Sequence, residues 1–588
     1  MSLVGPLPPT LPAVTTKASA ANRPIGPYER RTAEVHAWDP AAVDVARRVS
    51  DLIREQRPDL VVEHIGSTAV PGLPGKGIVD LSIECEPGAI PGIVAMLYEL
   101  GFQAQPGPDP WPPTRPMPVG SIRHEGREYR IHLHVQPKGG DFPRDIAFRD
   151  ALRNDPALTL QYTDLKLGIT QGGAVDGFRY THSKTTWILG IYRKLGFVPP
   201  AILPPAMIGI LGGGQLGRML ALAAREMGYR IAVLDPDEHA PAASIADRMV
   251  VGTYADLEPA RRLATGCAVV TYELEHVSAP LVSAIDDGTI PIRPGPYPLK
   301  MTQDRLAERK FLESNGVPVA PWRGVASGAD VRAAAAQLGY PVRLKATTGG
   351  YDGRSQHRLA NPAEVDALLA AQPIDTSMLL EREIDFEAEL SVVVARATDG
   401  ICVSFPPSRN VHRDGILIES SVPAGIALAT ERAARELSER LATGMGLIGV
   451  LTVELFLMRD GSLVVNELAP RVHNSGHWTI EGAATSQFEQ HVRAICGLPL
   501  GSVELRAPAA AMVNLLGTGE RRETAIEGLR EALGVPDTHL HLYDKRAVFE
   551  RRKMGHVTAL GATPDEALGR AREAISLLRW VGKDAPNG

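Results

Sequence analysis

Two glutamates lie thirteen residues apart in neighbouring apolar segments that have the character of strands. Glu454 lies within Val450–Phe456, and Glu467 follows the apolar run Leu463–Val465 and Asn466. Carboxylates on neighbouring strands can hold Mg²⁺ against nucleotide phosphates, because this cation takes oxygen ligands and often keeps only one or two from the protein. The pair therefore predicts a magnesium–nucleotide site with Glu454 and Glu467 as the metal ligands.

A group of side chains that can bind anions follows Glu467 within a few residues. Its members are Arg471, His473, Asn474, Ser475 and His477. Charged and neutral hydrogen-bond donors held in one loop suit an anionic, phosphate-like intermediate. Beside a nucleotide site, this group predicts the ATP-dependent activation of a small molecule.

A lysine at the end of a strand precedes a glycine-rich segment. Lys345 closes the apolar pattern Pro341–Lys345, and residues 346–355 read ATTGGYDGRS. A lysine before a flexible glycine loop can neutralise nucleotide phosphates while the loop closes over them. Taken alone, the pattern is also typical of a simple hairpin turn, and the spacing to the next elements strengthens the nucleotide interpretation.

Two acidic residues follow at a spacing that suits the rest of a nucleotide. The segment Leu379–Ile384 contains Glu381 and could be a hinge whose backbone meets an adenine edge. Glu389, eight residues after Glu381, could accept the ribose hydroxyls. The alternative is that both glutamates form an acidic strand edge without a ligand.

The segment Gly212–Gly217 matches the pattern G-x-G-x-x-G. A strand, Ile208–Leu211, precedes it, a helix to about Met227 follows, and Asp235 ends the next strand. This arrangement is typical of a dinucleotide site. The glycines can instead serve only tight helix–strand packing, or the helix N-terminus can receive the phosphate of a different ligand. Because the chain beyond this segment supplies a nucleotide-phosphate site, we favour the last alternative and expect no nicotinamide cofactor.

Length and composition are typical of a soluble protein with several domains. The 588 residues predict three to five domains, and a net charge of −6 gives no indication of a basic face for nucleic acid. The four cysteines are far apart and show neither metal nor disulfide spacing, which favours a reducing cytoplasm. Prolines interrupt the N-terminus, so we expect no signal peptide, and no apolar run reaches the roughly 18 residues of a membrane span.

The chain divides where its composition changes. Residues 1–24 are rich in Pro, Ala and Thr and are expected to be disordered. Residues 196–206 contain four prolines and predict a stiff linker. Alternating strands and helices predict a multidomain α/β protein. The expected parts are an αβ region at 25–195, a Rossmann-like domain at 207–305, a nucleotide-binding domain at 306–502 and a small C-terminal domain at 503–588.

The first region carries a different set of polar residues. The pair Gly66-Ser67 precedes, after a short spacer, the strand Ile78–Ile83. This pattern resembles the nucleotidyltransferase fold, in which Gly-Ser grips a phosphate and carboxylates two residues apart bind Mg²⁺. One face of the strand carries Asp80, Ser82 and Glu84, so the usual second carboxylate is missing or displaced.

A second strand of this region, Arg130–Val135, places His132 and His134 on one face. These histidines can be metal ligands, or they can hydrogen-bond locally, as most histidines in sheets do. Together with a helical stretch that opens at Phe148–Arg153 and with Lys166, the region resembles the GrpB-like family over about residues 25–195. The open functions are a metal-dependent nucleotidyl transferase and a partner domain that binds a nucleotide or nothing.

The second half resembles the ATPase subunit of phosphoribosylaminoimidazole carboxylase, that is, the 5-(carboxyamino)imidazole ribonucleotide synthases, ATP-grasp enzymes of purine biosynthesis. The similarity covers residues 206–575 in order. Matching stretches are GILGGGQLGRML (209–220), TYELEHV (271–277), TQDRLAERKFL (302–312), KATTGGYDGRSQ (345–356), EREIDFEAELSVVVAR (381–396), TVELF (452–456), NELAPRVHNSGHWTIEGAATSQFEQHVRAICGLPLG (466–501) and YDKRAVFERRKMGHVT (543–558). The resemblance implies a pre-ATP-grasp domain at 207–305 and an ATP-grasp domain at 306–502.

The resemblance also implies a role for each group of residues. ATP would be bound by Lys345, Glu381, Ile384, Glu389 and Asn466, and Mg²⁺ by Glu454 and Glu467. Bicarbonate and the carboxyphosphate made from it would be held by Arg471, His473 and Asn474, with Lys545 also in the catalytic set. Aminoimidazole ribonucleotide would be bound by Tyr351, Arg354, Lys545 and Arg552, with Glu273 or Glu275 near its amino group. A closing glycine loop would exclude water from the mixed anhydride.

Three positions depart from the family pattern. Ser355 stands where the family usually has Gly, and Arg309, or Lys310 if the register shifts by one, stands where many members have Lys. One apparent extra residue before Met-Gly-His leaves the ligand of the substrate phosphate open. The candidates are Arg551, Arg552 and Lys553.

The combined prediction is a fusion of a GrpB-like domain with an ATP-grasp carboxylating ligase. It would use ATP, Mg²⁺ and bicarbonate on aminoimidazole ribonucleotide in the cytoplasm, as a homodimer without nucleic-acid or membrane partners. One alternative keeps the ligase but carboxylates a different amine, because purine biosynthesis has no evident need for the extra domain. Another is a regulator that binds ATP without turnover, which the carboxylate pair and the anion-binding group disfavour.

Overall fold

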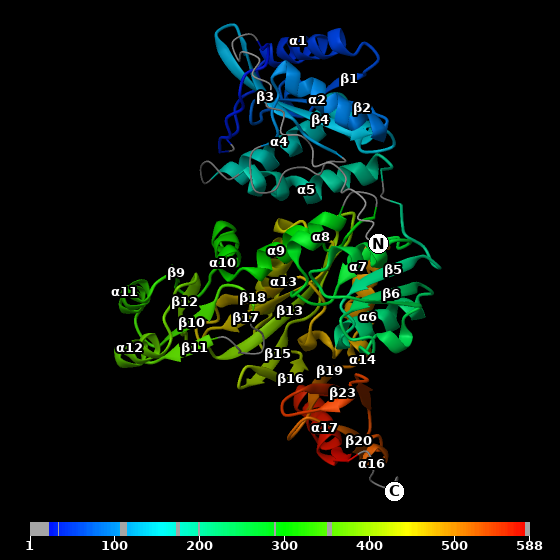
Figure 1. The fold of residues 1–588 in the computed structure, drawn as a ribbon, viewed down its shortest axis with the longest axis vertical. Helices are drawn as coiled ribbons and strands as arrows, with labels where there is room; N and C mark the ends of the chain where they lie inside the picture. The colour runs from blue at the N-terminus through cyan, green and yellow to red at the C-terminus, as the bar shows by residue number, and fades with distance from the viewer. Residues whose placement is uncertain are drawn as a thin grey trace, which may run out of the picture. The chain divides into compact units, whose positions relative to one another are not determined.

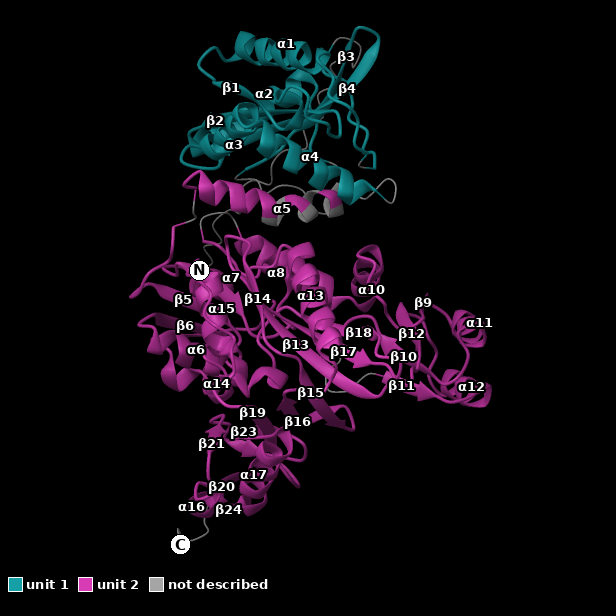
Figure 2. Ribbon diagram, turned by 180° about the vertical axis from the view of Figure 1, so that it is seen from behind, with its two compact units in different colours: residues 1–177 teal, residues 178–588 magenta. Residues whose placement is uncertain are grey.

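Two compact units make up the structure, a computed structural model that describes residues 23–32, 34–105, 115–171, 177–197, 200–286, 290–349 and 356–582. The first unit is residues 1–177 and the second is residues 178–588 (Figure 2). Each has its own clusters of buried apolar side chains. Among the described helices, none has the length and apolar character to cross a membrane. Most of the segment 1–24, for which the sequence predicted disorder, lies outside the described residues.

The first unit is an α+β fold built on a mixed sheet with strand order β1-β2-β4-β3 (Figure 1). Strands β2 and β4 are parallel, and the other pairs are antiparallel. Val79, Leu81 and Ile83 are buried together with residues of α1 and α2, because alternate side chains of a strand share one face. The elements are α1 (Ala41–Gln56), β1 (Val62–Ile65), η2 (Ser67–Ala69), β2 (Ile78–Cys85), η3 (Pro87–Ala89), α2 (Ile90–Leu100), β3 (Val119–His124), β4 (Arg127–Pro137), α3 (Phe142–Asn154) and α4 (Pro156–Thr170).

A parallel sheet with strand order β7-β6-β5-β8 opens the second unit. Its central strands are almost continuously apolar, as expected where helices connect parallel strands and cover both faces. The predicted succession of strand, glycine turn, helix and strand is confirmed. The elements are α5 (Gly177–Lys194), which starts at the unit boundary, β5 (Met207–Leu211), α6 (Gln215–Glu226), β6 (Arg230–Asp235), η4 (Ala243–Ile245), β7 (Arg248–Val251), α7 (Leu257–Ala264), β8 (Val269–Tyr272), α8 (Ala279–Ile285) and α9 (Pro296–Gln303).

A small antiparallel sheet with strand order β11-β10-β12-β9 follows, and it carries Lys345 and Glu381. The helices α11 and α12 bury their apolar residues against it. The segment Leu379–Ile384, for which a hinge was considered, is a strand up to Arg382. The elements are α10 (Arg305–Ser314), β9 (Trp322–Val325), α11 (Gly328–Leu338), β10 (Val342–Ala346), β11 (Gln356–Leu359), α12 (Pro362–Ala371) and β12 (Met378–Arg382).

A nine-stranded sheet forms the centre of the second unit, with strand order β18-β17-β13-β15-β16-β19-β23-β21 and β14 paired to β13. Its strands are β13 (Ala388–Arg396), β14 (Cys402–Ser404), β15 (Ser408–Arg413), β16 (Ile416–Val422), β17 (Gly449–Leu457), β18 (Leu463–Ala469), β19 (Ala509–Leu516), β21 (Thr538–Leu542) and β23 (Lys553–Gly561). Because β19 pairs with β16, the sheet continues into the C-terminal part without a break. The small C-terminal domain predicted at 503–588 therefore contributes β19, β21 and β23 to this sheet.

The remaining elements cover this sheet or extend its C-terminal part. A further, three-stranded sheet in the C-terminal part has the strand order β22-β20-β24. The elements are α13 (Leu428–Gly444), η5 (Asn474–Gly476), α14 (Thr479–Gly482), α15 (Gln487–Ile495), β20 (Arg522–Glu527), α16 (Leu529–Ala532), β22 (Ala547–Val548), α17 (Pro564–Leu577) and β24 (Arg579–Gly582).

A buried histidine joins the parallel sheet to the nine-stranded sheet. The Nδ1 atom of His491, on α15, accepts the backbone N–H of Val450 over 3.2 Å, and its Nε2 atom lies 2.8 Å from the hydroxyl of Thr271. His491 is fully buried, and burial lowers its pKa to about 3. A neutral histidine therefore fixes the two sheets against each other.

We expect acid to weaken this connection. The pKa of His491 is lower in the folded than in the unfolded chain, so the unfolded chain binds the extra proton below about pH 6.5. Stability that is present above pH 6.5 is thus lost as the pH falls towards 3. Thermal melts of the full chain between pH 7.5 and pH 4.5 should show a steeper decline for the wild type than for His491→Gln. The exposed His539→Gln is the matched control, and equal slopes for all three proteins would contradict the prediction.

Candidate functional site

The two carboxylates predicted to bind Mg²⁺ face each other across a strand pair. Glu454 on β17 is the register partner of Glu467 on β18, and the register shifts between Glu454 and Leu455. The shift leaves Asn466 as the extra residue of a β-bulge, a feature that re-aims side chains. The Nδ2 atom of Asn466 donates to Oε2 of Glu454 over 3.4 Å. Strand β18 continues to Ala469, so Asn466 and Glu467 lie within the strand rather than just after it.

The electrostatics of this pair favour a cation. Like charges directly opposite each other destabilise a sheet. Burial and the neighbouring Glu467 raise the pKa of Glu454 to about 8. Within the described part of the chain, no group of three or more His, Cys, Asp or Glu side chains is arranged to hold a metal ion. Two carboxylates alone suit Mg²⁺ that takes its other ligands from water and nucleotide phosphates.

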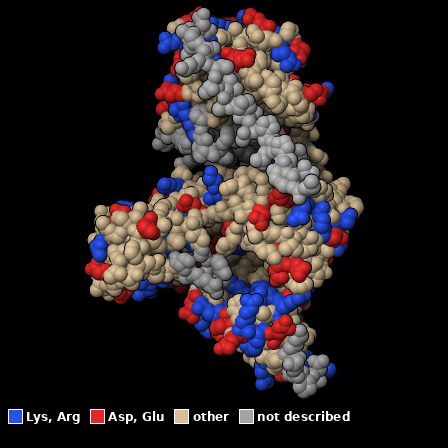
Figure 3. All heavy atoms as spheres, in the orientation of Figure 1, with Lys and Arg blue, Asp and Glu red and all other residues tan. Residues whose placement is uncertain are grey.

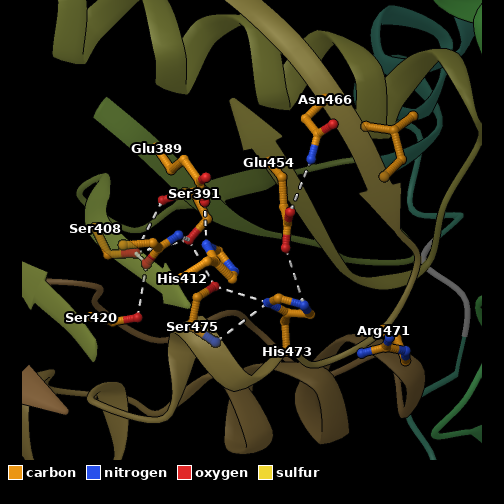
Figure 4. A network of polar contacts seen from close by, with 12 residues as sticks. Glu389, Ser391, Ser408, His412, Ser420, Glu454, Asn466, Arg471, His473 and Ser475 are labelled. Atoms are coloured by element: carbon orange, nitrogen blue, oxygen red, sulfur yellow. Dashed lines mark hydrogen bonds and ion pairs between the residues drawn. The ribbon is translucent and has the colours of Figure 1, made fainter. Parts of the chain in front are cut away.

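His473 lies beside Glu454, whose carboxylate lies between His473 and Asn466 (Figure 4). Its Nε2 atom lies 3.4 Å from Oε1 of Glu454, and its Nδ1 atom lies 2.9 Å from the hydroxyl of Ser475. Burial, and then the positive charge of Arg471, hold the pKa of His473 well below its ordinary value. The imidazole beside the carboxylate pair is therefore neutral.

Asn474 and Arg471 have buried polar atoms without a partner. Both the oxygen and the nitrogen of the Asn474 amide are buried and bond to nothing in the structure. Arg471 is bound by Glu275, with Nη2 of Arg471 at 2.5 Å from Oε1 of Glu275, while its Nε atom has no partner. Unsatisfied buried polar groups are costly, so their presence in one loop is consistent with a site for a polar ligand.

The residues predicted for the nucleotide phosphates form a buried charge network. Lys345 and Arg309 both form ion pairs with Glu381, and Nη2 of Arg309 lies 3.0 Å from Oε2 of Glu381. Burial favours the neutral form of Glu381, but the two cations outweigh it and lower its pKa. Arg309 also contacts Glu308 and is buried, whereas Lys310 is exposed. This geometry makes Arg309 a counter-charge of Glu381 rather than an exposed phosphate ligand.

Glu389, predicted to accept the ribose hydroxyls, has a partner that the sequence did not indicate. It forms an ion pair with His412 on β15. Burial lowers the pKa of His412, but the pairing with Glu389 outweighs burial and leaves the pKa raised. The contact joins neighbouring strands β13 and β15. Ile384 lies in the partly buried segment between β12 and β13. The adenine contact predicted for Ile384 remains a prediction.

The glycine segment after β5 holds a carboxylate of the protein. The backbone N–H groups of Gly214 and Gly217 donate to Glu273 over 2.8 and 2.7 Å. A Cβ atom on Gly214 would lie 2.6 Å from Oε1 of Glu273, so only glycine leaves room for the carboxylate. Asp235 accepts the N–H of Gly213 over 2.8 Å. In the structure, a side chain rather than a ligand phosphate therefore occupies the N-terminus of α6, which corrects the interpretation that we favoured.

We expect no saturable binding of NAD or NADP to the full chain. Asp235, the residue expected to bind a ribose, is buried and also accepts the hydroxyl of Tyr254 over 2.7 Å. The backbone amides that a pyrophosphate would need are bonded to Glu273. Isothermal titration calorimetry with each dinucleotide, and with ADP as the positive control, tests this prediction. Micromolar binding of either dinucleotide would contradict it.

The predicted substrate-phosphate ligands come from the C-terminal part. Lys545 Nζ donates to Oε1 of Gln215 at the N-terminus of α6 and to the carbonyl of Lys553, both over 2.6 Å. Arg552 stacks on Phe549 at 5.0 Å and donates to the carbonyl of Ala547. Figure 3 shows Lys and Arg side chains gathered beside a hollow over this part.

The apparent extra residue before Met-Gly-His coincides with two backbone irregularities. Arg551 has a φ of +67°, which is uncommon for a residue with a side chain. The register of β19 with β23 shifts so that Leu516 pairs with Lys553 and Leu515 with Gly555. The guanidinium of Arg551 donates a hydrogen bond to the backbone carbonyl of Asp414, while Arg552 and Lys553 are half-buried. Tyr351, Arg354 and Ser355 lie outside the described residues.

Sequence reasoning missed several residues that contact the site. Glu308 accepts the backbone N–H of Leu468, next to Glu467, over 2.6 Å. Arg305 donates to the carbonyls of Ala346 and Gly349, which flank the start of the glycine loop. The signal for Arg305 was its place in the matched stretch 302–312, but no local pattern indicated its contacts.

In the first unit, the histidine pair is engaged locally. Nδ1 of His132 lies 3.4 Å from Oδ1 of Asp80, and Nε2 of His134 lies 3.8 Å from the same oxygen. Tyr28 contacts the other nitrogen of His132 over 2.9 Å. This geometry supports the interpretation of local hydrogen bonding. Asp80, Ser82 and Glu84 share a face of β2, and the nucleotidyltransferase likeness stays a prediction.

Four family models match the chain. They are the GrpB protein at residues 32–194, the ribonucleotide synthetase preATP-grasp domain at 206–303, the ATP-grasp domain at 310–488 and the phosphoribosylaminoimidazole carboxylase C-terminal domain at 510–570. Together they show a multidomain α/β protein, as the sequence predicted.

Individual relatives match the second half over almost their whole length. An N5-carboxyaminoimidazole ribonucleotide synthase of Brucella melitensis is 43% identical over 363 residues, which are 61% of this chain and 98% of the relative. A crystal structure of an N5-carboxyaminoimidazole ribonucleotide synthetase in complex with ADP has 43% identity and a TM-score of 0.60, and the match covers 64% of this chain and 98% of that one. An Aspergillus clavatus enzyme in complex with ADP and 5-aminoimidazole ribonucleotide has 32% identity and a TM-score of 0.57, over 63% of this chain and 98% of that one.

Proposed function

The chain belongs to the N5-carboxyaminoimidazole ribonucleotide synthases, and we propose that its second unit carboxylates 5-aminoimidazole ribonucleotide with ATP and bicarbonate. It is an ATP-grasp ligase of purine biosynthesis that carries an additional GrpB domain. The observation that carries this function is the convergence of the carboxylate pair Glu454 and Glu467 with the anion-binding group Arg471, His473 and Asn474.

The carboxylate pair fits Mg²⁺. Glu454 and Glu467 oppose each other directly, and without a cation the pKa of Glu454 is raised to about 8. When bound there, Mg²⁺ would neutralise charge on the nucleotide phosphates. Lys345 and Glu381 would take part in binding ATP. Arg309, which also pairs with Glu381, would keep this carboxylate anionic if Lys345 bound a phosphate instead. Ile384 would contact the adenine, and Glu389 would bind the ribose. Asn466 would lie at the phosphate end of the nucleotide.

The reaction needs activation of a poor electrophile. Bicarbonate attacks the γ-phosphorus of ATP, ADP leaves, and the product is carboxyphosphate, a mixed anhydride. The exocyclic amine of the ribonucleotide then forms a C–N bond at the carboxyl carbon as the C–O bond to phosphate breaks, or phosphate leaves first and the amine attacks the released CO₂. In either case the amine loses one proton, which the departing phosphate can accept. Arg471, His473 and Asn474 would bind the negative oxygens through fixed donors, which cost no reorganisation during the reaction. Closure of the glycine loop would exclude water.

The ribonucleotide would lie between the parallel sheet and the C-terminal part. Lys545 bridges the two, because it bonds Gln215 and the carbonyl of Lys553. Arg552 supplies a second cation on this face, and the family resemblance adds Tyr351 and Arg354 of the loop. Either Glu273 or Glu275 would lie near the amino group; the backbone amides of α6 hold Glu273, and Arg471 holds Glu275.

A phosphate-release assay tests the function. Purified full chain with ATP, Mg²⁺ and bicarbonate should release phosphate at a rate that rises steeply when 5-aminoimidazole ribonucleotide is added. Incorporation of ¹⁴C from bicarbonate into an acid-labile product identifies the carboxylation. ATP turnover that depends on another amine but not on this ribonucleotide would refute the assignment of the acceptor.

We expect the second unit to carry the whole activity. Every residue assigned to the reaction lies after 206, and the apolar cluster of the first unit contains only residues of that unit. A fragment of residues 206–588 should keep kcat within about tenfold of the full chain. A folded fragment that has lost more than about 100-fold, roughly 2.7 kcal/mol, would contradict independence.

A slightly longer fragment serves as the control. Ile202, within the linker, donates its N–H to the carbonyl of Cys496 over 2.8 Å and accepts the hydroxyl of Tyr229 over 2.6 Å. A fragment of residues 200–588 retains these contacts. If only the shorter fragment is unstable, the linker rather than the first unit is responsible.

The cellular location and the oligomeric state of the protein are further proposals. The four cysteines are all free, which supports a reducing cytoplasm. We also propose a homodimer, to be measured by analytical ultracentrifugation. The first unit would bind a ligand or a partner of its own, since all the groups assigned to carboxylation lie in the second unit.

A further inference from the structure

A chain of buried hydroxyl and amide groups ends at His473 (Figure 4). It comes from three neighbouring strands and from η5, and every member is at most 6% exposed. Buried polar groups are costly unless they are bonded, and here they bond to one another. The members, called the hydroxyl network below, are Ser391 on β13, Ser408 and Asn410 on β15, Ser420 on β16, and Ser475 on η5.

The contacts from Ser420 through Asn410 and Ser391 to Ser475 run in one direction, whereas either hydroxyl can donate between Ser391 and Ser408. Asn410 Nδ2 donates to the hydroxyl of Ser391 over 3.0 Å, and Ser391 donates to the hydroxyl of Ser475 over 2.7 Å. Ser420 donates to Oδ1 of Asn410 over 2.8 Å, which orients the amide. Ser391 pairs with Ser408, and Asn410 with Ser420, across adjacent strands. The sheet therefore holds the donors rigidly in place.

The end of the hydroxyl network sets which ring nitrogen of His473 carries the proton. The backbone N–H of Ser475 donates to Nδ1 of His473 over 3.3 Å, and the Ser475 hydroxyl lies 2.9 Å from the same nitrogen. A backbone N–H can only donate, so Nδ1 presents its lone pair. The Ser475 hydroxyl accepts from Ser391 and is free to donate to Nδ1 as well. A neutral imidazole whose Nδ1 accepts carries its hydrogen on Nε2.

The Nε2 side of His473 faces the candidate site. It lies 3.4 Å from Oε1 of Glu454. The neighbouring Asn474 amide and the Nε atom of Arg471 are buried without partners. A ligand oxygen placed among these groups would thus meet an N–H of His473 and no lone pair of the ring.

We propose that the hydroxyl network positions His473 and holds it in the tautomer protonated on Nε2, so that His473 donates a hydrogen bond to an oxygen of bicarbonate or carboxyphosphate. The inference rests on the proposed function for the identity of that anion. It makes Ser391, Asn410 and Ser475 positioning residues and assigns His473 the role of a fixed donor rather than a proton acceptor. A fixed donor stabilises negative charge without first losing or gaining a proton.

The tautomer is measured directly by NMR. In full-length enzyme labelled with ¹⁵N-histidine, the resonances of His473 are assigned by their loss in His473→Gln. We expect the ¹⁵N shift of Nδ1 in the range of an unprotonated ring nitrogen and that of Nε2 in the range of a protonated one. A protonated Nδ1 in the ligand-free enzyme would overturn the proposal. This readout does not depend on turnover, so it stands apart from the test of the proposed function.

The donor role is tested by two substitutions of His473. The amide of Gln can place an N–H near the position of Nε2, but it cannot accept a proton as a base. We therefore expect His473→Gln to retain at least about tenfold more kcat than His473→Ala, because a restored donor recovers part of the stabilisation of the anion. Equal loss in the two variants would overturn the donor role.

The positioning role is tested by Ser475→Ala with Ser438→Ala as the matched control. Both hydroxyls are fully buried, but Ser438 donates only to the carbonyl of Ala434 within α13, over 2.8 Å. Groups that orient a metal-bound histidine typically contribute about 10–100-fold in activity, and we expect an effect of the same order for His473. We expect Ser475→Ala to lower kcat by this factor with KM for ATP unchanged, and to change the ¹⁵N shift of Nδ1, because that nitrogen loses the hydroxyl and keeps only the backbone N–H as a donor. A loss of kcat no larger than that of Ser438→Ala would overturn the positioning role. If Ser475→Ala does not fold, Ser391→Ala is measured in its place.

Discussion

Replacing Glu467 by Gln should lower the ATP turnover of the full chain by about a thousandfold, roughly 4 kcal/mol of transition-state stabilisation. The substitution keeps the size and one oxygen of the side chain but removes its charge. Glu467 faces Glu454 directly, so the change leaves a single carboxylate to hold Mg²⁺ against the nucleotide phosphates. Steady-state phosphate release with saturating bicarbonate and ribonucleotide measures the loss.

Stability should move in the opposite direction to activity in this variant. Without Mg²⁺, the two carboxylates repel each other, and Gln at position 467 removes that repulsion. The melting temperature of Glu467→Gln without Mg²⁺ should therefore equal or exceed that of the wild type. Added Mg²⁺ with ADP should stabilise the wild type more than the variant. The exposed Glu436→Gln on α13 is the charge-matched control, and wild-type turnover in Glu467→Gln would refute the metal site.

Replacing Asn474 by Ala should lower kcat by about 10²–10³-fold, the cost of losing one fixed donor to a developing anion. In the structure, the Asn474 amide is buried and neither of its polar atoms has a partner. Truncation therefore breaks no hydrogen bond of the ligand-free protein. We expect the free energy of unfolding to stay the same or to rise slightly, because an unsatisfied buried amide is removed.

A second buried asparagine provides the contrast. Asn514 on β19 donates to the carbonyl of Leu417 over 2.8 Å and has no assigned role in the reaction. Asn514→Ala should destabilise the protein by about 1–3 kcal/mol, since it leaves a buried carbonyl without its donor. Its kcat should match that of the wild type. If Asn474→Ala instead destabilises the protein and keeps kcat, the amide is structural and does not contact the anion.

The sequence by itself determined the local order of the ligase half. The apolar runs around Glu454 and Glu467, joined by a short polar turn, favour a hairpin, so the two carboxylates were expected on adjacent strands, and they are. The strand, glycine turn and helix at 208–227 followed in the same way from periodicity and from the glycines. The specific blocks at 345–356 and 466–501 indicated the family, which the relatives confirm. Residue patterns of this kind act over a few turns or strands, and they need no knowledge of distant contacts.

The tertiary structure decided which of those residues meet and what they are bonded to. Lys345, Glu381 and Arg309 form one charge network although they are far apart in the chain, because β10 pairs with β12 and α10 supplies the third residue. Glu273 fills the glycine turn some 60 residues away from it in sequence, which removed the phosphate site expected there. No local pattern encodes such contacts, since they depend on the order in which strands join a sheet.

The bulge at Asn466 and the hydroxyl network that contacts His473 are also features that only the tertiary structure decided. A bulge adds one residue to a strand without changing its apolar pattern, so the sequence shows the strand but not the register shift. Ser391, Ser408, Asn410 and Ser420 look like ordinary strand residues until β13, β15 and β16 lie side by side. They reach His473 only through Ser475, because the nine-stranded sheet and η5 bring five separate polar groups into a single buried chain.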